Sequence, residues 1–279
     1  MEERIPNQFL FIFGMKKHRE PFHLSHYLCI ESCWQVNQPE RIYFYFHHEP
    51  FGPYWNAARK RVIPVRADLI PLVSRFHYGL RNRACRKYRY AHQSDFIRLE
   101  KLIEKGGIYA DIDTIFVNKF PPHLFEKPFV LGREDDIICM GTHCIQPSLC
   151  NALIMSRTNS EFAHLWLTKM NTAFDGSWSN HSTLLPQQLS EQYPELIHIE
   201  PSRSFYKHMW TRQGIHTLLE GCDKDYEGVI SMHLWSHLWW SKKRRDFSDF
   251  HEGLLTEHYI RDVDTTYNLV ARRFLPEKA

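Results

Sequence analysis

The stretch SDFIRLEKLIEKGGIYADID, residues 94–113, decides the fold class of this chain. Apolar residues recur at helical spacing through Gln93–Lys105, which predicts a helix there with Ser94 as its N-cap. The pair Gly106-Gly107 ends that helix and allows it to approach the next segment closely, because glycine has no side chain. The following apolar run, Ile108–Val117, predicts a strand. A helix that returns into a strand in this way is typical of α/β proteins.

Asp111 and Asp113 interrupt that strand with two carboxylates. Successive side chains of an extended chain alternate faces, so we expect these two acids to point to the same side. Two adjacent carboxylates repel each other unless a cation lies between them, and an oxygen ligand set suits Mg²⁺ or Mn²⁺. Asp95 and Arg98 lie three residues apart and share one face of the preceding helix. The sequence therefore predicts an acid, a guanidinium and a metal site at one sheet edge.

The N-terminal fifty residues predict the start of a mainly parallel sheet. A strand over Ile5–Phe13, a helix over Phe22–Val36 and a strand over Arg41–His47 form a βαβ unit. No repeat or linker divides the chain, so we expect one domain spanning residues 1–279. Further strands are expected over Val62–Val65, Phe129–Gly132, Ala152–Ser156 and Val229–His233, and further helices over Ser160–Asn171 and His181–Gln192.

The composition argues against a nucleic-acid-binding protein, because 35 Lys and Arg against 32 Asp and Glu leave a net charge of only +3. Basic residues gather in Arg81–Arg89 and in Lys242–Arg245. We expect the second run, with Trp239 and Trp240, to assist docking to an anionic membrane or a lipid-linked acceptor. Seven cysteines without CxxC pairs indicate a reduced compartment.

The sequence contains no apolar run long enough to cross a bilayer, and the start Met1-Glu2-Glu3-Arg4 does not resemble a signal peptide. We therefore expect a cytoplasmic protein, either free in the cytoplasm or in peripheral contact with the inner face of the cell membrane.

The run from Ser94 to Asp113, with Asp95, Arg98 and Tyr109 inside it, resembles the sugar-binding DXD region of glycosyltransferase family 32. This region is shared in outline with fungal α-mannosyltransferases, animal α1,4-glycosyltransferases and the glucosylating domains of large clostridial toxins. A weaker resemblance to bacterial capsule-type members extends over most of the chain. It rests on Ile5-Pro6-Asn7, Pro21-Phe22-His23, Gly52-Pro53-Tyr54-Trp55, Asn151-Ala152 and His233-Leu234-Trp235.

The resemblance implies an α/β fold of GT-A type, with a Rossmann-like, mainly parallel central sheet flanked by helices. It implies that Asp113 binds a divalent metal, Mn²⁺ or Mg²⁺, and that Asp111 contacts the ribose and the metal shell, which makes these two the catalytic residues. His233 is the expected third metal ligand, with His237 as its alternative. The expected donor-binding residues are Phe13, Gly14, Ser94, Asp95, Arg98, Tyr109, Glu134, Asp135, Asn151, Ala152 and Trp235.

The activity implied by the resemblance is metal-dependent transfer of a hexose or N-acetylhexosamine from a nucleotide sugar to a hydroxyl of a glycan, polysaccharide or lipid-linked acceptor. UDP is the first choice of nucleotide and GDP the second. Transfer is expected to retain the anomeric configuration, with a phosphate oxygen as base, so no protein nucleophile is required.

Two other interpretations of the same residues stay open from the sequence. Asp111 and Asp113 also match the two acids of the DxDxT nucleophile loop of haloacid-dehalogenase-like phosphatases, with Asp111 as the nucleophile. That loop normally follows the first strand of its fold, whereas here it lies beyond residue 100. The other interpretation is a nucleotide-sugar-binding protein without turnover.

Overall fold

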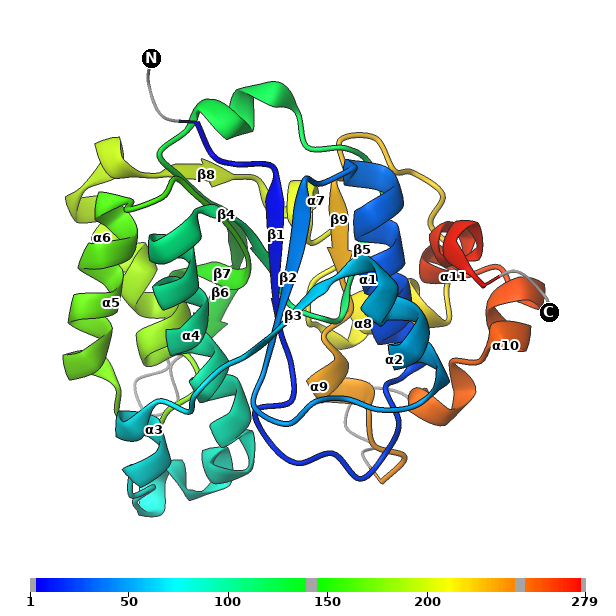
Figure 1. Cartoon of the computed structure of the whole chain (residues 1–279), viewed down its shortest axis with the longest axis horizontal. Coiled ribbons are helices and arrows are strands. Elements are labelled where there is room, and N and C mark those ends of the chain that lie inside the picture. The colour runs from blue at the N-terminus through cyan, green and yellow to red at the C-terminus, as the bar shows by residue number, and fades with distance from the viewer. Residues whose placement is uncertain (1–3, 139–144, 244–248, 277–279) are drawn as a thin grey trace.

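A seven-stranded sheet runs through the middle of the molecule in the computed structural model, which describes residues 4–138, 145–243 and 249–276 (Figure 1). The strand order is β3-β2-β1-β4-β7-β6-β8, and every neighbouring pair is parallel except the two pairs made by β7. The strands of this sheet are β1 (Gln8–Ile12), β2 (Arg41–Phe46), β3 (Ile63–Arg66), β4 (Gly107–Ala110), β6 (Phe129–Ile138), β7 (Ile145–Ser156) and β8 (His198–Glu200).

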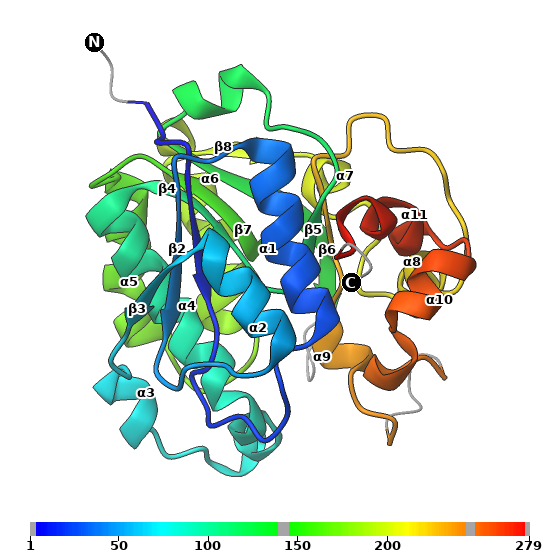
Figure 2. The same cartoon turned by 45° about the vertical axis from the view of Figure 1, so that its right-hand side comes forward.

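Helices cover both faces of this sheet, and Figure 2 shows α1 and α2 on one side with α4 and α5 on the other. The α-helices are α1 (Leu24–Asn37), α2 (Pro53–Ala58), α3 (Pro71–Arg75), α4 (Arg89–Lys105), α5 (Glu161–Ala173), α6 (Leu185–Gln192), α7 (Ser202–Phe205), α8 (Arg212–Leu219), α9 (Ser236–Trp239), α10 (Glu257–Asp262) and α11 (Thr266–Ala271). The 3₁₀ helices are η1 (Arg59–Arg61), η2 (Leu80–Tyr88), η3 (Pro122–Glu126), η5 (Pro194–Leu196), η6 (Glu252–Leu254) and η7 (Arg272–Phe274), and η4 (Asn180–Leu184) is a π-helix.

The N-terminal βαβ unit confirms the prediction made from its alternating apolar segments. β1 pairs in parallel with β2, and α1 connects them across one face of the sheet. The ring of His23 caps α1 by accepting a hydrogen bond from the Ser25 amide at 3.2 Å. Gln38 ends the helix in the left-handed conformation. The sheet therefore has the mainly parallel, helix-flanked α/β arrangement that the sequence predicts.

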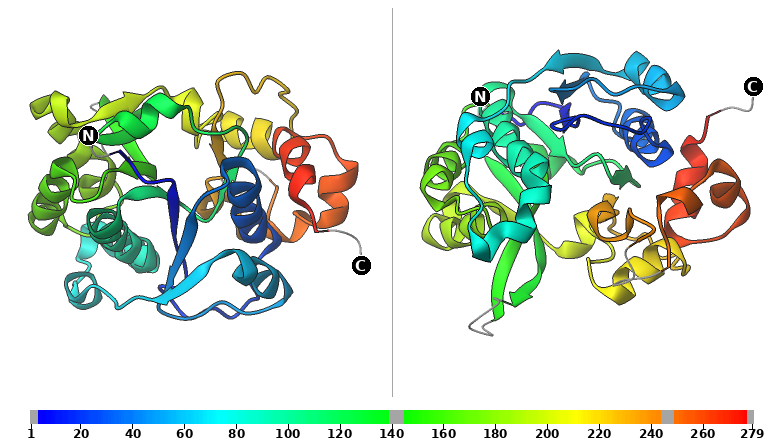
Figure 3. Two further views of the ribbon diagram at one scale, coloured as in Figure 1. Left: turned by 45° about the horizontal axis from the view of Figure 1, so that its top comes forward. Right: turned by 90° about the horizontal axis from the view of Figure 1, so that it is seen from below.

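Two hydrophobic clusters form the core, one on each face of the sheet. One contains Phe9, Phe11 and the inner residues of α1, and the other contains Leu10, Ile12 and the inner residues of α4 and α5. The side chains of neighbouring residues in β1 thus pack into opposite clusters, because side chains alternate between the two faces of a strand. The two views of Figure 3 show the sheet between these layers and the C-terminal helices beside α1.

The predicted strand over Ile108–Val117 is wrong in one respect, because the chain leaves the main sheet in its middle. After β4 the chain makes a turn, in which the Thr114 amide donates a hydrogen bond to the Asp111 carbonyl at 3.1 Å. This turn leads into β5 (Thr114–Phe116). β5 pairs with β9 (Ser231–His233) in a separate two-stranded antiparallel sheet. Asp111 and Asp113 therefore lie in a turn between two sheets, and strand alternation is not the reason that they converge.

Helix α4 begins earlier than predicted, at Arg89, because it continues directly from η2 with Tyr88 at its N-cap position. Ser94 is consequently not a cap, and its hydroxyl donates instead to the Tyr90 carbonyl at 3.2 Å. A hydroxyl inside a helix commonly bonds to the carbonyl four residues before it. The predicted helix over His181–Gln192 likewise begins earlier, with η4, and the predicted strand ends at Gly132 and Ala152 lie within the longer β6 and β7.

None of the described helices is both long and apolar enough to cross a membrane. The cysteines of the described residues, Cys29, Cys33, Cys85, Cys150 and Cys222, are free thiols, and Cys139 and Cys144 lie outside these residues.

The pair Gly106-Gly107 permits the tight passage from α4 into the sheet, as the sequence predicts. Both residues have positive φ, +65° and +104°. A Cβ on Gly107 would lie 2.5 Å from the carbonyl oxygen of Gln8 in β1. That contact is far below a normal van der Waals distance, and β1 cannot move without disturbing the central sheet.

We expect Gly107→Ala to lower the free energy of unfolding by about 2–3 kcal/mol, through left-handed strain and the clash with β1. Urea unfolding measures this change. Gly79→Ala is the matched control, since Gly79 has φ of −64° and no heavy atom within 4 Å of an added Cβ. Equal stability of the two variants would contradict this account of the turn.

Candidate active site

A cavity of about 1060 Å³ opens where β1 and β4 end. In Figure 1 this is the lower end of β1, where α9 and the loop after β1 also lie. Carboxyl ends of parallel strands form the usual ligand-binding edge of an α/β sheet. The cavity lining includes these residues singled out from the sequence: Phe13, Gly14, Ser94, Asp95, Arg98, Tyr109, Asp111, Asp113, Glu134, Asn151, Ala152, His233, Trp235 and His237.

Asp113 and His233 meet because β5 pairs with β9. Thr114 lies opposite His233 in this ladder, and the Leu234 amide donates to the Asp113 carbonyl at 2.8 Å. The His233 Nε2 atom lies 3.0 Å from Asp113 Oδ1 and 3.7 Å from Asp111 Oδ2. A local pairing of two short strands thus joins residues that are 120 positions apart.

The charges of this pair stabilise each other despite their burial. Burial opposes a charged carboxylate, but His233 and the Ser236 amide outweigh it and hold the pKa of Asp113 far below its usual range. Burial also opposes a charged imidazole, but the carboxylates of Asp113 and Asp111 outweigh it and raise the pKa of His233. The site therefore attracts positive charge to the point between its carboxylates.

Asp111 is the more accessible carboxylate, with 28% of its side chain exposed. Its Oδ1 accepts a short hydrogen bond from the Tyr109 hydroxyl and lies 3.5 Å from Arg98 Nη2. Burial raises the pKa of Asp111, and the opposing effects of Arg98 and His233 do not cancel this rise. Asp111 is thus held in place by two neighbours while part of it faces the cavity.

The turn after β9 completes the surroundings of Asp113. Trp235 adopts a left-handed backbone conformation, φ +53°, which is uncommon for a bulky side chain. Its indole donates to the His208 carbonyl at 2.9 Å and packs against the His233 ring at 4.2 Å. The backbone then directs the Ser236 amide to Asp113 Oδ2 at 2.7 Å. Strain of this kind is commonly held at functional sites.

Asp111, Asp113 and His233 fit a divalent metal ion. One ligand atom from each residue lies within 4.8 Å of the others. Ligands held about 2.0–2.1 Å from Mg²⁺ in an octahedron lie about 3–4 Å apart, so only small movements are needed. The two carboxylates suit Mn²⁺ or Mg²⁺, and the imidazole also suits other divalent transition-metal ions. His237 is not part of this cluster, and its ring packs instead against Trp178 at 4.9 Å.

Asp95 and Arg98 form a buried network behind the carboxylates. Asp95 Oδ1 lies 3.0 Å from Arg98 Nη2 and accepts from the Asn151 side chain at 2.9 Å, and Asp95 Oδ2 lies 3.0 Å from His181 Nε2. Arg98 Nη1 donates to the Asn151 carbonyl at 2.6 Å. The network thus links α4, β7 and η4 and orients the guanidinium that faces Asp111.

Phe13 and Gly14 form the cavity wall at the end of β1. The Phe13 ring stacks on the His18 ring at 4.3 Å. Gly14 has φ of +78°, and a Cβ there would lie 2.2 Å from the His48 carbonyl oxygen. The chain therefore turns sharply behind Phe13 and leaves its ring in the cavity lining.

The β6–β7 pair forms the opposite part of the lining. The Ala152 carbonyl accepts a hydrogen bond from the Asp111 amide at 2.8 Å, which holds the turn between β4 and β5 against β7. Glu134 Oε2 accepts from the Ser148 hydroxyl at 3.5 Å. The side chain of Asp135, the remaining predicted donor-binding residue, lies outside the described residues.

Sequence reasoning missed several aromatic residues of the lining, among them His26, Tyr88 and Trp178. They come from segments without a motif, so only the folded chain brings them together. The predicted membrane-docking stretch is partly wrong, because Trp239 is buried and donates to the Leu234 carbonyl at 2.5 Å. Trp240 stacks on His26 inside the cavity at 5.2 Å. Arg244 and Arg245 lie outside the described residues.

We expect Asp95→Asn to destabilise the fold by about 2–4 kcal/mol, because it removes a counter-ion from the buried Arg98. Urea unfolding of the metal-free protein measures this loss. Glu104→Gln serves as the control, since Glu104 pairs with Lys101 and Lys105 at an exposed position and should change stability by less than about 1 kcal/mol. Comparable losses in both variants would contradict a buried network.

Comparisons with known proteins find a family model, a relative in sequence and a similar solved structure. Residues 26–130 match the model of the glycosyltransferase sugar-binding region containing a DXD motif. Glucan organizing enzyme 1 of Cryptococcus neoformans var. grubii is 28% identical over 281 residues, which cover 98% of this chain and 72% of that protein. The solved structure of the PaToxG glycosyltransferase aligns with 69% of this chain and 71% of its own, at 20% identity and a TM-score of 0.42.

Proposed function

We propose that the chain is a glycosyltransferase with a DXD-containing sugar-binding region, and within that class a metal-dependent, retaining hexosyltransferase. Its donor is a sugar linked to a nucleoside diphosphate, UDP first and GDP second. Its acceptor is a hydroxyl of a glycan, polysaccharide or lipid-linked saccharide. One domain spanning residues 1–279 carries both sites.

The observation that carries this proposal is the cluster of Asp111, Asp113 and His233 on the wall of the cavity. Ligand atoms within 4.8 Å of one another are close enough for one cation, and a volume of about 1060 Å³ accommodates a nucleotide sugar together with an acceptor group. Asp113 and His233 hold the metal ion, Mn²⁺ or Mg²⁺, and Asp111 contributes to its shell. A bound ion of this kind neutralises charge that develops on a leaving diphosphate.

The surrounding residues orient the donor in this proposal. Phe13 and Gly14 receive the base at the end of β1, and Trp235 closes the cavity beside His233. Arg98 faces the donor sugar, while Tyr109 holds Asp111 in position through its hydroxyl. A guanidinium and carboxylates fixed before the substrate arrives need little reorganisation during transfer.

The proposed retention of the anomeric configuration comes from the resemblance to the family, and it requires no protein nucleophile. The carboxylates nearest the centre are already engaged, Asp113 by His233 and Asp95 by Arg98, Asn151 and His181. The acceptor hydroxyl then attacks C1 on the face that the diphosphate leaves, and a phosphate oxygen takes its proton. The new glycosidic bond forms as the bond between C1 and the diphosphate oxygen breaks.

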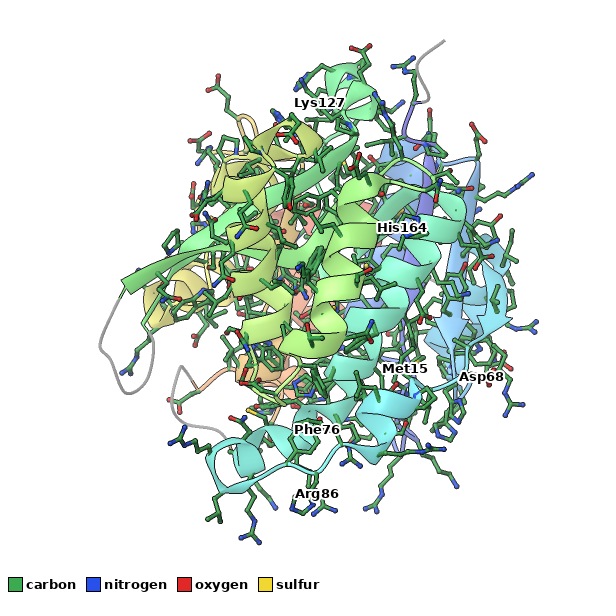
Figure 4. All side chains as sticks on the ribbon, turned by 90° about the vertical axis from the view of Figure 1, so that its left-hand side faces the viewer. Met15, Asp68, Phe76, Arg86, Lys127 and His164 are labelled. Atoms are coloured by element: carbon green, nitrogen blue, oxygen red, sulfur yellow. The ribbon has the colours of Figure 1, made fainter. Side chains whose placement is uncertain are left out.

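The location and the acceptor chemistry belong to the same proposal. The relative's name refers to glucan, and we infer that a glucan or related polysaccharide is the first acceptor to test. Free thiols at the described cysteines support a reduced, cytoplasmic compartment. The basic run Arg81–Arg89 in η2 and the start of α4 is the candidate for a peripheral membrane contact, and Figure 4 shows Arg86 at one end of the molecule, away from Lys127.

The test is turnover of UDP- and GDP-sugars by purified protein, with Mn²⁺, with EDTA, and with short glucan acceptors. We expect one donor to be consumed with Mn²⁺ alone, slowly by hydrolysis and faster with an acceptor, and EDTA to stop both reactions. Asp113→Asn should lower turnover by at least about 100-fold, because it removes a metal ligand. Asp68→Asn is the matched control, since Asp68 is exposed and outside the cavity lining.

Unchanged turnover of Asp113→Asn would contradict the metal assignment. Metal-dependent cleavage of a simple phosphate ester, with no sugar nucleotide consumed, would favour the phosphatase interpretation with Asp111 as nucleophile. Tight binding of a sugar nucleotide without any turnover would favour a binding protein.

A further inference from the structure

A group of aromatic rings at the cavity has no part in the proposed donor and metal chemistry. Tyr88 ends η2, Trp178 precedes η4, and His237 belongs to α9. The Trp178 ring centroid lies 5.0 Å from that of Tyr88 and 4.9 Å from that of His237. The Tyr88 and His237 ring centroids are 6.3 Å apart. All three line the cavity. We call these three residues the aromatic platform.

Trp178 is the unusual member, because 38% of it is exposed. It is the most exposed of the eight tryptophans, all of which the structure describes. Large aromatic side chains normally bury their faces, and an exposed face inside a cavity is typical of a ligand contact. Trp178 therefore offers exposed aromatic surface to a ligand in the cavity.

The lining beside Trp178 is polar. Ser179, Ser182 and Thr183 follow Trp178 and line the same cavity. The buried Ser182 and Thr183 hydroxyls donate to the Trp178 and Ser179 carbonyls at 2.6 and 3.2 Å, so they can only accept from a ligand. The Lys87 amine lies 4.7 Å from the Tyr88 ring centre. The segment after Trp178 is the π-helix η4, a distortion that is frequent at functional sites. An aromatic face bordered by hydroxyls and an amine matches a pyranose ring, which has C–H groups on its faces and hydroxyls around its edge.

Two hydrogen bonds hold the platform beside the carboxylates. His181, three residues after Trp178, lies 3.0 Å from Asp95 Oδ2. The Ser236 amide, next to His237, donates to Asp113 Oδ2 at 2.7 Å. Two of the three segments of the platform are therefore fixed to acids that line the same cavity.

We propose that the aromatic platform binds the acceptor, and that this acceptor is a saccharide whose ring packs on Trp178. This assignment rests on the proposed glycosyl transfer and makes it more specific, since it excludes acceptors that offer only a lipid or peptide hydroxyl. It also separates the roles of the cavity walls, with the donor at Phe13 and Gly14 and the acceptor at Trp178.

Kinetics of Trp178→Ala and Trp178→Phe test the platform in the full-length protein, with Mn²⁺, the consumed donor and laminaritriose or maltotriose as acceptor. We expect Trp178→Ala to lower the ratio of transfer to hydrolysis about tenfold, through a higher acceptor KM. Trp178→Phe should recover part of the loss, because it keeps a ring face. Tyr193→Ala is the matched control, an aromatic residue that is 37% exposed and outside the cavity lining.

An unchanged ratio in Trp178→Ala, or an equal fall of hydrolysis and transfer in a folded variant, would overturn the assignment. Saturation-transfer NMR with the same two trisaccharides, without nucleotide, measures binding separately. Binding by the wild type that weakens in Trp178→Ala and persists in Tyr193→Ala supports the platform, and no binding by the wild type overturns it. Absence of donor turnover in every protein would contradict the proposed function and leave the binding comparison intact.

Discussion

The pairing of Thr114 in β5 with His233 in β9 is the constraint on which the site depends. β4 of the main sheet ends just before Asp111, and β5 of the short second sheet begins at Thr114. The turn between them is therefore fixed at both ends. Because the partner strand ends in His233, the same ladder adds an imidazole to the two carboxylates. A site formed by pairing of two backbones is positioned more rigidly than one formed by loops alone.

Buried charge is tolerated here because each charged group has fixed partners. Arg98 lies among Asp95, Asp111 and the Asn151 carbonyl, and its guanidinium also packs over the Tyr109 ring at 4.5 Å. Removing the Asp95 carboxylate leaves the buried Arg98 with the more distant Asp111 carboxylate at 3.5 Å, and weakening a buried pair in this way costs more than breaking a surface ion pair. The network behind the carboxylates thus contributes to both the geometry of the site and the stability of α4 against β7.

The sequence predicts the sheet and its flanking helices because they follow from local periodicity and from turn residues. The βαβ start and the passage through Gly106-Gly107 are examples, since each depends on neighbouring residues. The N-cap at Ser94 and the single strand through Asp113 are wrong because local patterns do not show what changes them. There, η2 extends α4 toward its N-terminus although its residues show no clear helical pattern, and β9, more than 100 residues further along the chain, pairs with β5 outside the main sheet.

The same distinction separates the site residues that could be predicted from those that could not. Asp95, Arg98, Asp111 and Asp113 lie in one motif, and the spacing alone groups them. Trp178 and Tyr88 belong to no motif, and their approach is visible only once α4 and η4 are packed together. His233 lies between these cases, because a resemblance names it while strand pairing explains its place.

Anomalous diffraction from crystals grown with Mn²⁺ and UDP tests the central claim most directly, since it locates the ion without relying on turnover. We expect one manganese peak about 2.0–2.3 Å from an oxygen of Asp113 and from Nε2 of His233, with Asp111 in its shell. A peak on His237, or nucleotide bound in the cavity with no manganese at these residues, would contradict the account.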